Sequence, residues 1–165
     1  MARRVFFSFH FDNDFFRTQQ VRNMGALDGQ TVCTANAWEK VKEEGDDAIE
    51  TWIDKNMSGK SCVVVLVGSG TAGRPWIKRE IVKGWDAGKG VLGIRIHKLL
   101  GTDGKPSSAG ANPFDGIKHS KSGKLLSTIA PLCSPTGADS KAAYKSINDN
   151  IEDWIEQAIA IRKEN

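Results

Sequence analysis

Glu80 is the residue of this sequence that best fits a catalytic role. It follows Trp76 by four positions, so the two side chains share one face of a helix predicted to begin at Pro75. A carboxylate in the first two turns of a helix can stabilise a developing cation or bind a pair of hydroxyl groups. The alternative is a solvated glutamate paired with Lys83 or Arg79, which composition alone favours. The residue types leave both interpretations open.

Further candidates follow two predicted strands. His10 could act as an acid or base near neutral pH, although a lone histidine at a strand end is more often structural. Asp12 is more often a helix cap than a catalyst. Trp76 could equally stack on a base or pack beneath a loop. Backbone N–H groups after the second strand could bind phosphate, although they match no Walker or dinucleotide motif. The residues after the two strands are Ser8, Phe9, His10, Asp12, Gly68, Ser69 and Thr71.

A β-α-β unit is predicted to position these residues. Cys62–Val67 is an unbroken apolar run rich in β-branched residues, typical of a strand buried on both faces. A glycine-rich loop, Gly68–Gly73, precedes helical spacing in Pro75–Ala87, and an extended apolar pattern resumes at Val91–Ile96. The crossover rule makes the two strands parallel, so the loop lies at the carboxyl end of the sheet, where open α/β sheets bind ligands.

The first part of the chain adds further elements. Arg4–Phe9 is predicted as the first strand, and doubly wound sheets often place such a strand centrally. Asp12 or Asn13 is expected to cap a helix that continues to Arg22. Thr31–Thr34 is a weaker candidate strand. Trp38–Met57 has helical spacing, with a second segment beginning near Asp46.

The last part of the chain completes the predicted fold. Leu125–Cys133 is expected to be an edge strand because Pro131 cannot donate to a central ladder. Alternating strands and helices predict an α/β fold, a three-layer sandwich of flavodoxin-like type with a mainly parallel sheet between helices. We expect one domain over 1–165, with a core of about 4–114, a loop-rich stretch at 100–124 and an amphipathic helix at about 141–162.

Bulk composition excludes several classes of protein. The chain is 39% hydrophobic and 26% charged, with no apolar run long enough for a membrane span and no signal peptide, so we expect a cytoplasmic protein. Cys33, Cys62 and Cys133 are widely spaced and odd in number, which argues against disulfides and zinc. His97 and His119 have no spaced partner, so no metal is expected. The net charge of +3 is dispersed, which does not indicate nucleic acid binding.

Two other α/β functions do not fit. A phospho-receiver needs an aspartate at the carboxyl end of its third strand, but Val67 is followed by Gly68 and Ser69. A flavin mononucleotide protein needs a Ser/Thr-rich phosphate loop after the first strand, where this chain has His10–Asn13.

Six stretches, taken in chain order, resemble the TIR-like family that supplies the sensor subunit of the bacterial Thoeris anti-phage system. The resemblance covers about Arg4 to Phe114, and the combination is far more specific than any single stretch. The stretches are Arg4–His10, Trp52–Ile53, Val63–Gly68, Trp76–Glu80, Gly90–His97 and Asn112–Phe114.

This resemblance implies a TIR fold and, in catalytic members, cleavage of NAD between nicotinamide and ribose. The family's catalytic glutamate falls on Glu80, where an anion would lie beside the oxocarbenium-like ribose while nicotinamide leaves as a neutral base. Ser8, Phe9 and His10 would line the cleft, together with Asp12, and Trp76 would support the glutamate or stack. The amides of Gly68, Ser69 and Thr71 would meet the pyrophosphate.

The resemblance also implies partners. NAD is a substrate, and no cofactor is expected. The ADP-ribose product, expected to be cyclic, would reach a partner effector as a diffusible signal, with a phage-derived trigger and self-association through TIR contacts. Because many TIR domains assemble without turnover, the alternative is a non-catalytic interaction module.

Overall fold

Strand β2 (Cys62–Val67) lies within the sheet, and its side chains alternate between two hydrophobic cores. In the computed structural model, which describes residues 4–24, 41–118 and 122–165, all six residues of β2 are buried. Cys62, Val64 and Leu66 face one core, whereas the residues between them face the other. The prediction of a strand covered on both faces is confirmed.

The sheet has four described strands in the order β1-β2-β3-β4, all parallel to their neighbours. They are β1 (Val5–Ser8), β2, β3 (Gly90–Arg95) and β4 (Leu132–Cys133). Among these described strands β1 lies at one end of the order, and its predicted central position stays a prediction. The candidate strand Thr31–Thr34 and the start of Trp38–Met57 lie outside the described residues.

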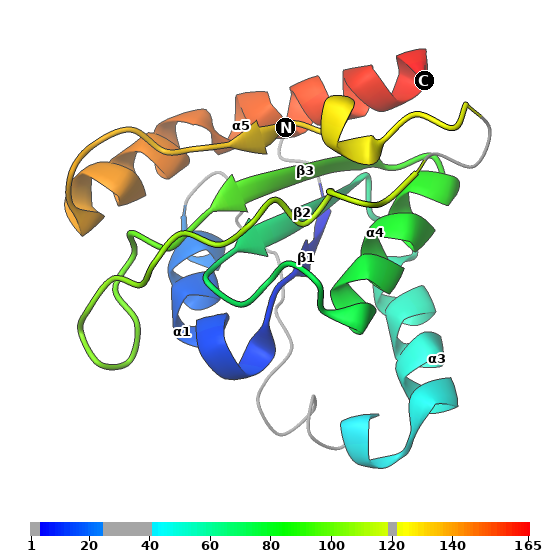
Figure 1. The fold of residues 1–165 in the computed structure, drawn as a ribbon, viewed down its shortest axis with the longest axis horizontal. Coiled ribbons are helices and arrows are strands. Elements are labelled where there is room, and N and C mark those ends of the chain that lie inside the picture. The colour runs from blue at the N-terminus through cyan, green and yellow to red at the C-terminus, as the bar shows by residue number, and fades with distance from the viewer. Residues whose placement is uncertain (1–3, 25–40, 119–121) are drawn as a thin grey trace.

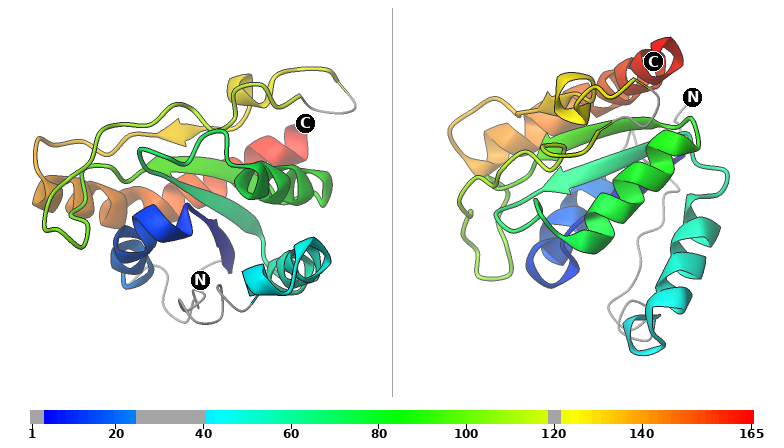
Figure 2. Two further views of the ribbon diagram at one scale, coloured as in Figure 1. Left: turned by 60° about the horizontal axis from the view of Figure 1, so that its bottom comes forward. Right: turned by 45° about the vertical axis from the view of Figure 1, so that its right-hand side comes forward.

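Helices cover both faces of the sheet, which confirms the three-layer α/β fold (Figures 1 and 2). One face packs against α1 (Phe11–Arg22) and α5 (Ser140–Glu164). The other face packs against α3 (Asp46–Met57) and α4 (Pro75–Asp86). None of the helices that the structure describes combines the length and the hydropathy of a bilayer-spanning segment.

The start of α1 differs from the prediction. Its N-cap is His10, not Asp12 or Asn13, because the backbone carbonyl of His10 accepts hydrogen bonds from the amides of Asn13 (3.2 Å) and Asp14 (2.8 Å). The Asn13 side chain instead donates to Ser69 Oγ at 3.2 Å. The helix therefore begins directly after β1 and brings its first turn close to the loop that follows β2.

Most described residues between β3 and η2 are irregular, as predicted for the stretch Leu100–Lys124, and an isolated bridge joins Lys118 to Leu125. The predicted strand Leu125–Cys133 was too long, because Leu126–Thr128 forms a 3₁₀ turn, η2, and only β4 is extended. Among the described strands β4 lies at an edge of the sheet, as predicted. The carbonyl of Pro131 accepts the Gly93 amide at 2.9 Å, which requires no N–H from the proline.

Candidate active site

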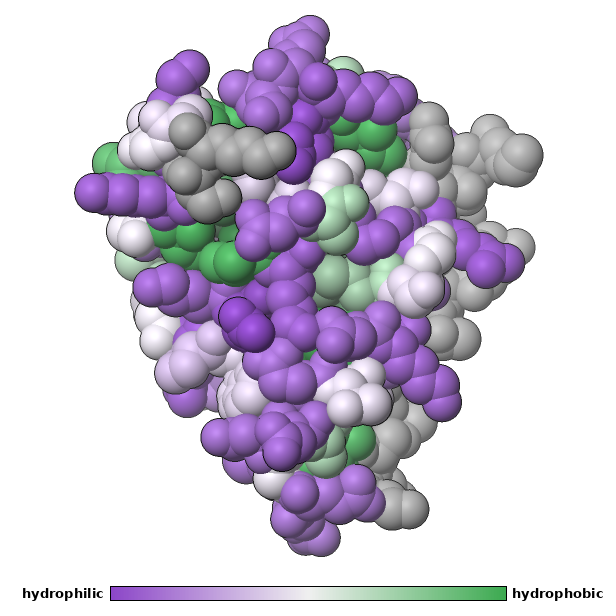
Figure 3. All heavy atoms as spheres, turned by 90° about the vertical axis from the view of Figure 1, so that its right-hand side faces the viewer, coloured by the Kyte–Doolittle hydropathy of each residue, from purple (hydrophilic) through white to green (hydrophobic). Residues whose placement is uncertain are grey.

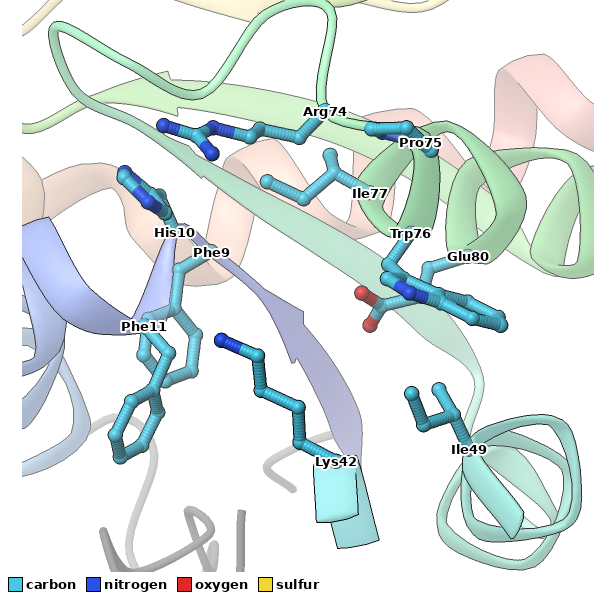
Figure 4. Close-up of a pocket in the computed structure, with 10 residues that line it drawn as sticks. All are labelled: Phe9, His10, Phe11, Lys42, Ile49, Arg74, Pro75, Trp76, Ile77 and Glu80. Carbon is cyan, nitrogen blue, oxygen red and sulfur yellow. The ribbon is translucent and has the colours of Figure 1, made fainter. Parts of the chain in front are cut away.

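A cleft of about 230 Å³ lies beyond the carboxyl end of β1 (Figure 4). Its walls come from the turn between β1 and α1, from the helical turn that precedes α3 and α3 itself, and from the first turns of α4. Such a position fits the rule that open parallel sheets bind ligands beyond their carboxyl ends. The lining residues are Phe9, His10, Phe11, Lys42, Ile49, Arg74, Pro75, Trp76, Ile77 and Glu80.

Glu80 is buried, with 6% of its surface exposed, and its carboxylate points into this cleft (Figure 4). The helix α4 begins with Pro75 at its first turn, and Ile77 and Ile81 pack into the core below. This packing fixes the rotation of the helix, so the face that carries Trp76 and Glu80 borders the cleft. Trp76 precedes Glu80 by one helical turn, and both side chains line the cleft.

The neighbouring cations of α4 do not neutralise Glu80. Arg79 and Lys83 both pair with Glu50 of α3, each at 2.6 Å, and Lys83 also pairs with Asp54. The side of the molecule that carries α3 and α4 is accordingly largely hydrophilic (Figure 3). The interpretation of Glu80 as a solvated glutamate paired with Lys83 or Arg79 is therefore wrong.

Burial controls the ionisation of Glu80. Removal from water raises the pKa of its carboxyl well above the ordinary 4.5, and the hydroxyl of Ser8 opposes this rise in part. Ser8 is fully buried, and its hydroxyl makes no hydrogen bond of ordinary geometry within the part of the chain that the structure describes. Within that part no basic side chain forms an ion pair with Glu80. Burial therefore favours the uncharged carboxyl, whereas a cationic ligand would favour the carboxylate.

Aromatic rings form the wall opposite Glu80. Phe9 and Phe11 line the cleft, with ring centroids 5.9 Å apart, and Phe15 lies 5.0 Å from Phe11. His10 follows Phe9 and lies against the loop after β2, since a Cβ atom on Gly70 would be 3.2 Å from His10 Nδ1. This wall offers flat apolar surfaces beside one imidazole.

The loop after β2 does not line the cleft. Thr71 is fully buried, and its Oγ1 accepts the Gly68 amide at 2.8 Å, which closes the loop on itself. Gly68 lies against the buried Asp14 carboxylate, and Ser69 receives the hydrogen bond from Asn13. The binding roles given to Gly68, Ser69 and Thr71 therefore stay predictions.

Some of the candidate residues named from the sequence line the cleft, and others lie outside it. Phe9, His10, Trp76 and Glu80 come together in the cleft, whereas Ser8 lies buried behind it, near Glu80. Asp12 belongs to the first turn of α1, and its side chain is not among those described.

Six of the described lining residues were not among the candidates named from the sequence, namely Phe11, Lys42, Ile49, Arg74, Pro75 and Ile77. Arg74 is the residue before Pro75, and it is the N-cap of α4. Lys42 and Ile49 reach the cleft from the region before β2. The helical spacing of Trp38–Met57 indicated which residues of that segment face the core, but no local pattern showed that this segment packs beside the start of α4.

Comparison with known proteins identifies the family. Residues 6–100, which include most of β1 and the cleft residues of α4, match the family described as "Thoeris protein ThsB, TIR-like domain". A protein of Bacillus cereus (strain MSX-D12) named "Putative cyclic ADP-D-ribose synthase ThsB1" is 37% identical over 133 residues, covering 76% of this chain and 69% of the relative. These findings confirm the resemblance seen in the sequence, and the chain belongs to the TIR-like ThsB family of Thoeris proteins.

Proposed function

We propose that this protein cleaves NAD between nicotinamide and ribose and converts the ADP-ribose part into a signal nucleotide, in the cyclic form. The observation that carries the proposal is the buried carboxyl of Glu80, which points into the cleft without a cationic partner among the described side chains. The name of the Bacillus cereus relative, a cyclic ADP-D-ribose synthase, supports the cyclic product.

The reaction breaks one C–N bond. The bonding electron pair leaves with the nicotinamide nitrogen, which becomes neutral, so no general acid is needed for departure. The anomeric carbon is left with positive charge, and the Glu80 carboxylate stabilises it. A nucleophile then donates its electron pair to this carbon. Water gives linear ADP-ribose, whereas a group of the same molecule gives a cyclic product and releases its proton.

The positively charged nicotinamide ring of NAD would bring a cation close to the Glu80 carboxyl. An opposite charge close to a buried carboxyl favours its ionised form, so binding of the ring cation and loss of the Glu80 proton support each other. The indole of Trp76 in the same cleft offers a flat surface for this ring. In this way the substrate generates the anion that its own cleavage requires.

The wider role follows from the family. We propose that the signal nucleotide diffuses in the cytoplasm to a partner effector of the anti-phage response, and that a phage-derived trigger and self-association control its production. Membership in the Thoeris family supports this part of the proposal.

Release of nicotinamide from NAD, followed by liquid chromatography, tests the proposal. The wild-type protein is assayed alone, with a crowding agent and with infected-cell extract, beside Glu80→Gln and the control Glu50→Gln. Glu50 pairs with Arg79 and Lys83 of α4 and is not among the described lining residues, so its variant should retain activity. Glu80→Gln should lose roughly 10²-fold to 10³-fold of the rate, the typical effect of removing one group that stabilises transition-state charge. If wild type and Glu80→Gln release nicotinamide equally, or neither does even when assembled, the non-catalytic interaction module is the better explanation.

A further inference from the structure

Two cations line the cleft together with Glu80. Lys42 comes from the helical turn before α3, and Arg74 is the N-cap of α4. Neither side chain forms an ion pair with an acidic residue among the described ones. Glu80 is the one acidic residue among the described lining residues, and burial favours its uncharged form. The charge that these residues present to an incoming ligand is therefore positive.

The two cations enter the cleft from opposite walls, and both extend toward the side that carries Phe9 and His10 (Figure 4). In Figure 4 the side chain of Lys42 extends toward Phe9 and His10, and the guanidinium of Arg74 extends toward His10. The carboxylate of Glu80 and the indole of Trp76 lie on the other side. The cleft thus has one part suited to an anion and another part suited to a sugar beside a ring cation.

Arg74 is oriented by the loop after β2. Its Nε–H donates to the backbone carbonyl of Gly70 at 3.1 Å, which leaves the terminal N–H groups for a ligand. A guanidinium held in this way presents a planar pair of donors that matches a phosphate group. The loop therefore acts on the anion-binding part of the cleft through the Gly70 carbonyl, which positions Arg74. This role differs from the one predicted for the amides of Gly68 to Thr71.

We propose that Lys42 and Arg74 bind the pyrophosphate group of the dinucleotide substrate and make the cleft select dinucleotides over nicotinamide nucleosides. The proposal rests on the proposed NAD cleavage, since it deepens the substrate choice of the same cleft. Nicotinamide riboside carries the ring cation and the ribose but no phosphate, so it would meet Glu80 without contacting the two cations. Binding through phosphate would hold the ribose of NAD in place beside Glu80.

Calorimetric binding of ADP-ribose, which has the pyrophosphate but no scissile nicotinamide bond, tests the proposal without turnover. The variants are Lys42→Gln, Arg74→Gln and the control Lys78→Gln. Lys78 is an exposed cation of α4 outside the cleft lining, so its variant makes the same change of charge elsewhere. Each cleft variant should raise the Kd about tenfold, the usual size for a hydrogen bond to a charged group. Lys78→Gln should change it less than about twofold.

Salt and kinetics give independent measurements. Because NaCl screens charge attraction, the Kd of the wild type should rise with salt, and this dependence should weaken in Lys42→Gln. With NAD as substrate, Lys42→Gln and Arg74→Gln should raise KM about tenfold and change kcat less than about threefold. Nicotinamide riboside should be cleaved more slowly than NAD, and its rate should be the same in the wild type and in both variants. Circular dichroism verifies that each variant is folded.

The outcomes separate this proposal from the proposed reaction. If ADP-ribose fails to bind the wild type, or binds all variants equally, the pyrophosphate role of Lys42 and Arg74 is overturned. Weakened ADP-ribose binding in those two variants, in a protein that releases no nicotinamide from NAD, would support the pyrophosphate site and reject the NAD cleavage.

Discussion

Replacing Glu80 by glutamine should stabilise the ligand-free protein by an amount that grows with pH. Burial raises the pKa of the folded Glu80 carboxyl well above 4.5, whereas the unfolded chain loses this proton near its ordinary pKa. Between the two pKa values the folded state binds more protons than the unfolded state, so the free energy of unfolding falls as pH rises. Glutamine has no proton to lose and removes this fall.

The size of the effect follows from proton linkage. One proton taken up per folded molecule changes the free energy of unfolding by about 1.4 kcal/mol per pH unit. Between pH 5 and pH 6 the advantage of Glu80→Gln over wild type should therefore increase, by at most about 1.4 kcal/mol, or about 5 °C in Tm for a domain of this length. Urea unfolding of both proteins, followed by tryptophan fluorescence at the two pH values, measures this change.

Glu50→Gln is the matched control. Hydrogen bonds from Lys83 and Arg79 lower the pKa of Glu50, so its stabilising contribution is present above the unfolded pKa and is lost as pH falls. Its variant should show a small loss of stability that does not grow between pH 5 and pH 6. Asp14 also has a pKa raised by burial, but it is present in all three proteins and cancels in the differences. A constant difference between Glu80→Gln and wild type over this pH range would refute the reasoning.

Two close contacts of glycines give further predictions. In Gly68→Ala the new Cβ would lie 2.5 Å from Oδ1 of Asp14, which is paired with Arg17 at 3.2 Å. The free energy of unfolding measured in urea should therefore fall by about 1 to 3 kcal/mol. A change below about 0.5 kcal/mol would mean that Asp14 moves freely. In Gly90→Ala the Cβ would lie 2.8 Å from the backbone nitrogen of Ile159 in α5, so a similar loss should appear with faster amide hydrogen exchange in α5. Unchanged exchange there would contradict this close approach.

The central unit of the fold could be predicted because its signals are local. The buried run of β2 admits few alternatives to an internal strand, and Pro75 marks the start of α4. The four-residue spacing of Trp76 and Glu80 then put both side chains on one face. These three signals were sufficient to place Glu80 near the carboxyl end of the sheet.

The surroundings of Glu80 could not be predicted because they depend on packing between distant segments. Arg79 and Lys83 lie closest to Glu80 along the chain, yet their partner Glu50 comes from α3, before β2. The same packing of α3 against the sheet brings Lys42 into the cleft. The residue types near Glu80 therefore indicated an exposed Glu80 paired with Arg79 or Lys83. In the folded chain these two cations pair with Glu50, and Glu80 is buried.

The wrong boundaries also have physical causes. The cap of α1 was assigned to polar side chains, but the backbone carbonyl of His10 closes the first turn and the Asn13 side chain contacts Ser69. In Leu125–Cys133 the apolar residues serve a 3₁₀ turn that packs Leu126 into the core, so hydrophobicity there did not require an extended strand.

Five of the ten described cleft residues lie in the seven positions from Arg74 to Glu80, so one short stretch of sequence forms half of the described lining. An insertion of one residue after Ile77 would turn Glu80 by about 100° around the axis of α4 and remove it from the cleft. The stretch Leu100–Lys124 contributes no described residue to the lining. Natural variants of this protein should therefore tolerate length changes in that stretch while keeping the spacing from Arg74 to Glu80 fixed.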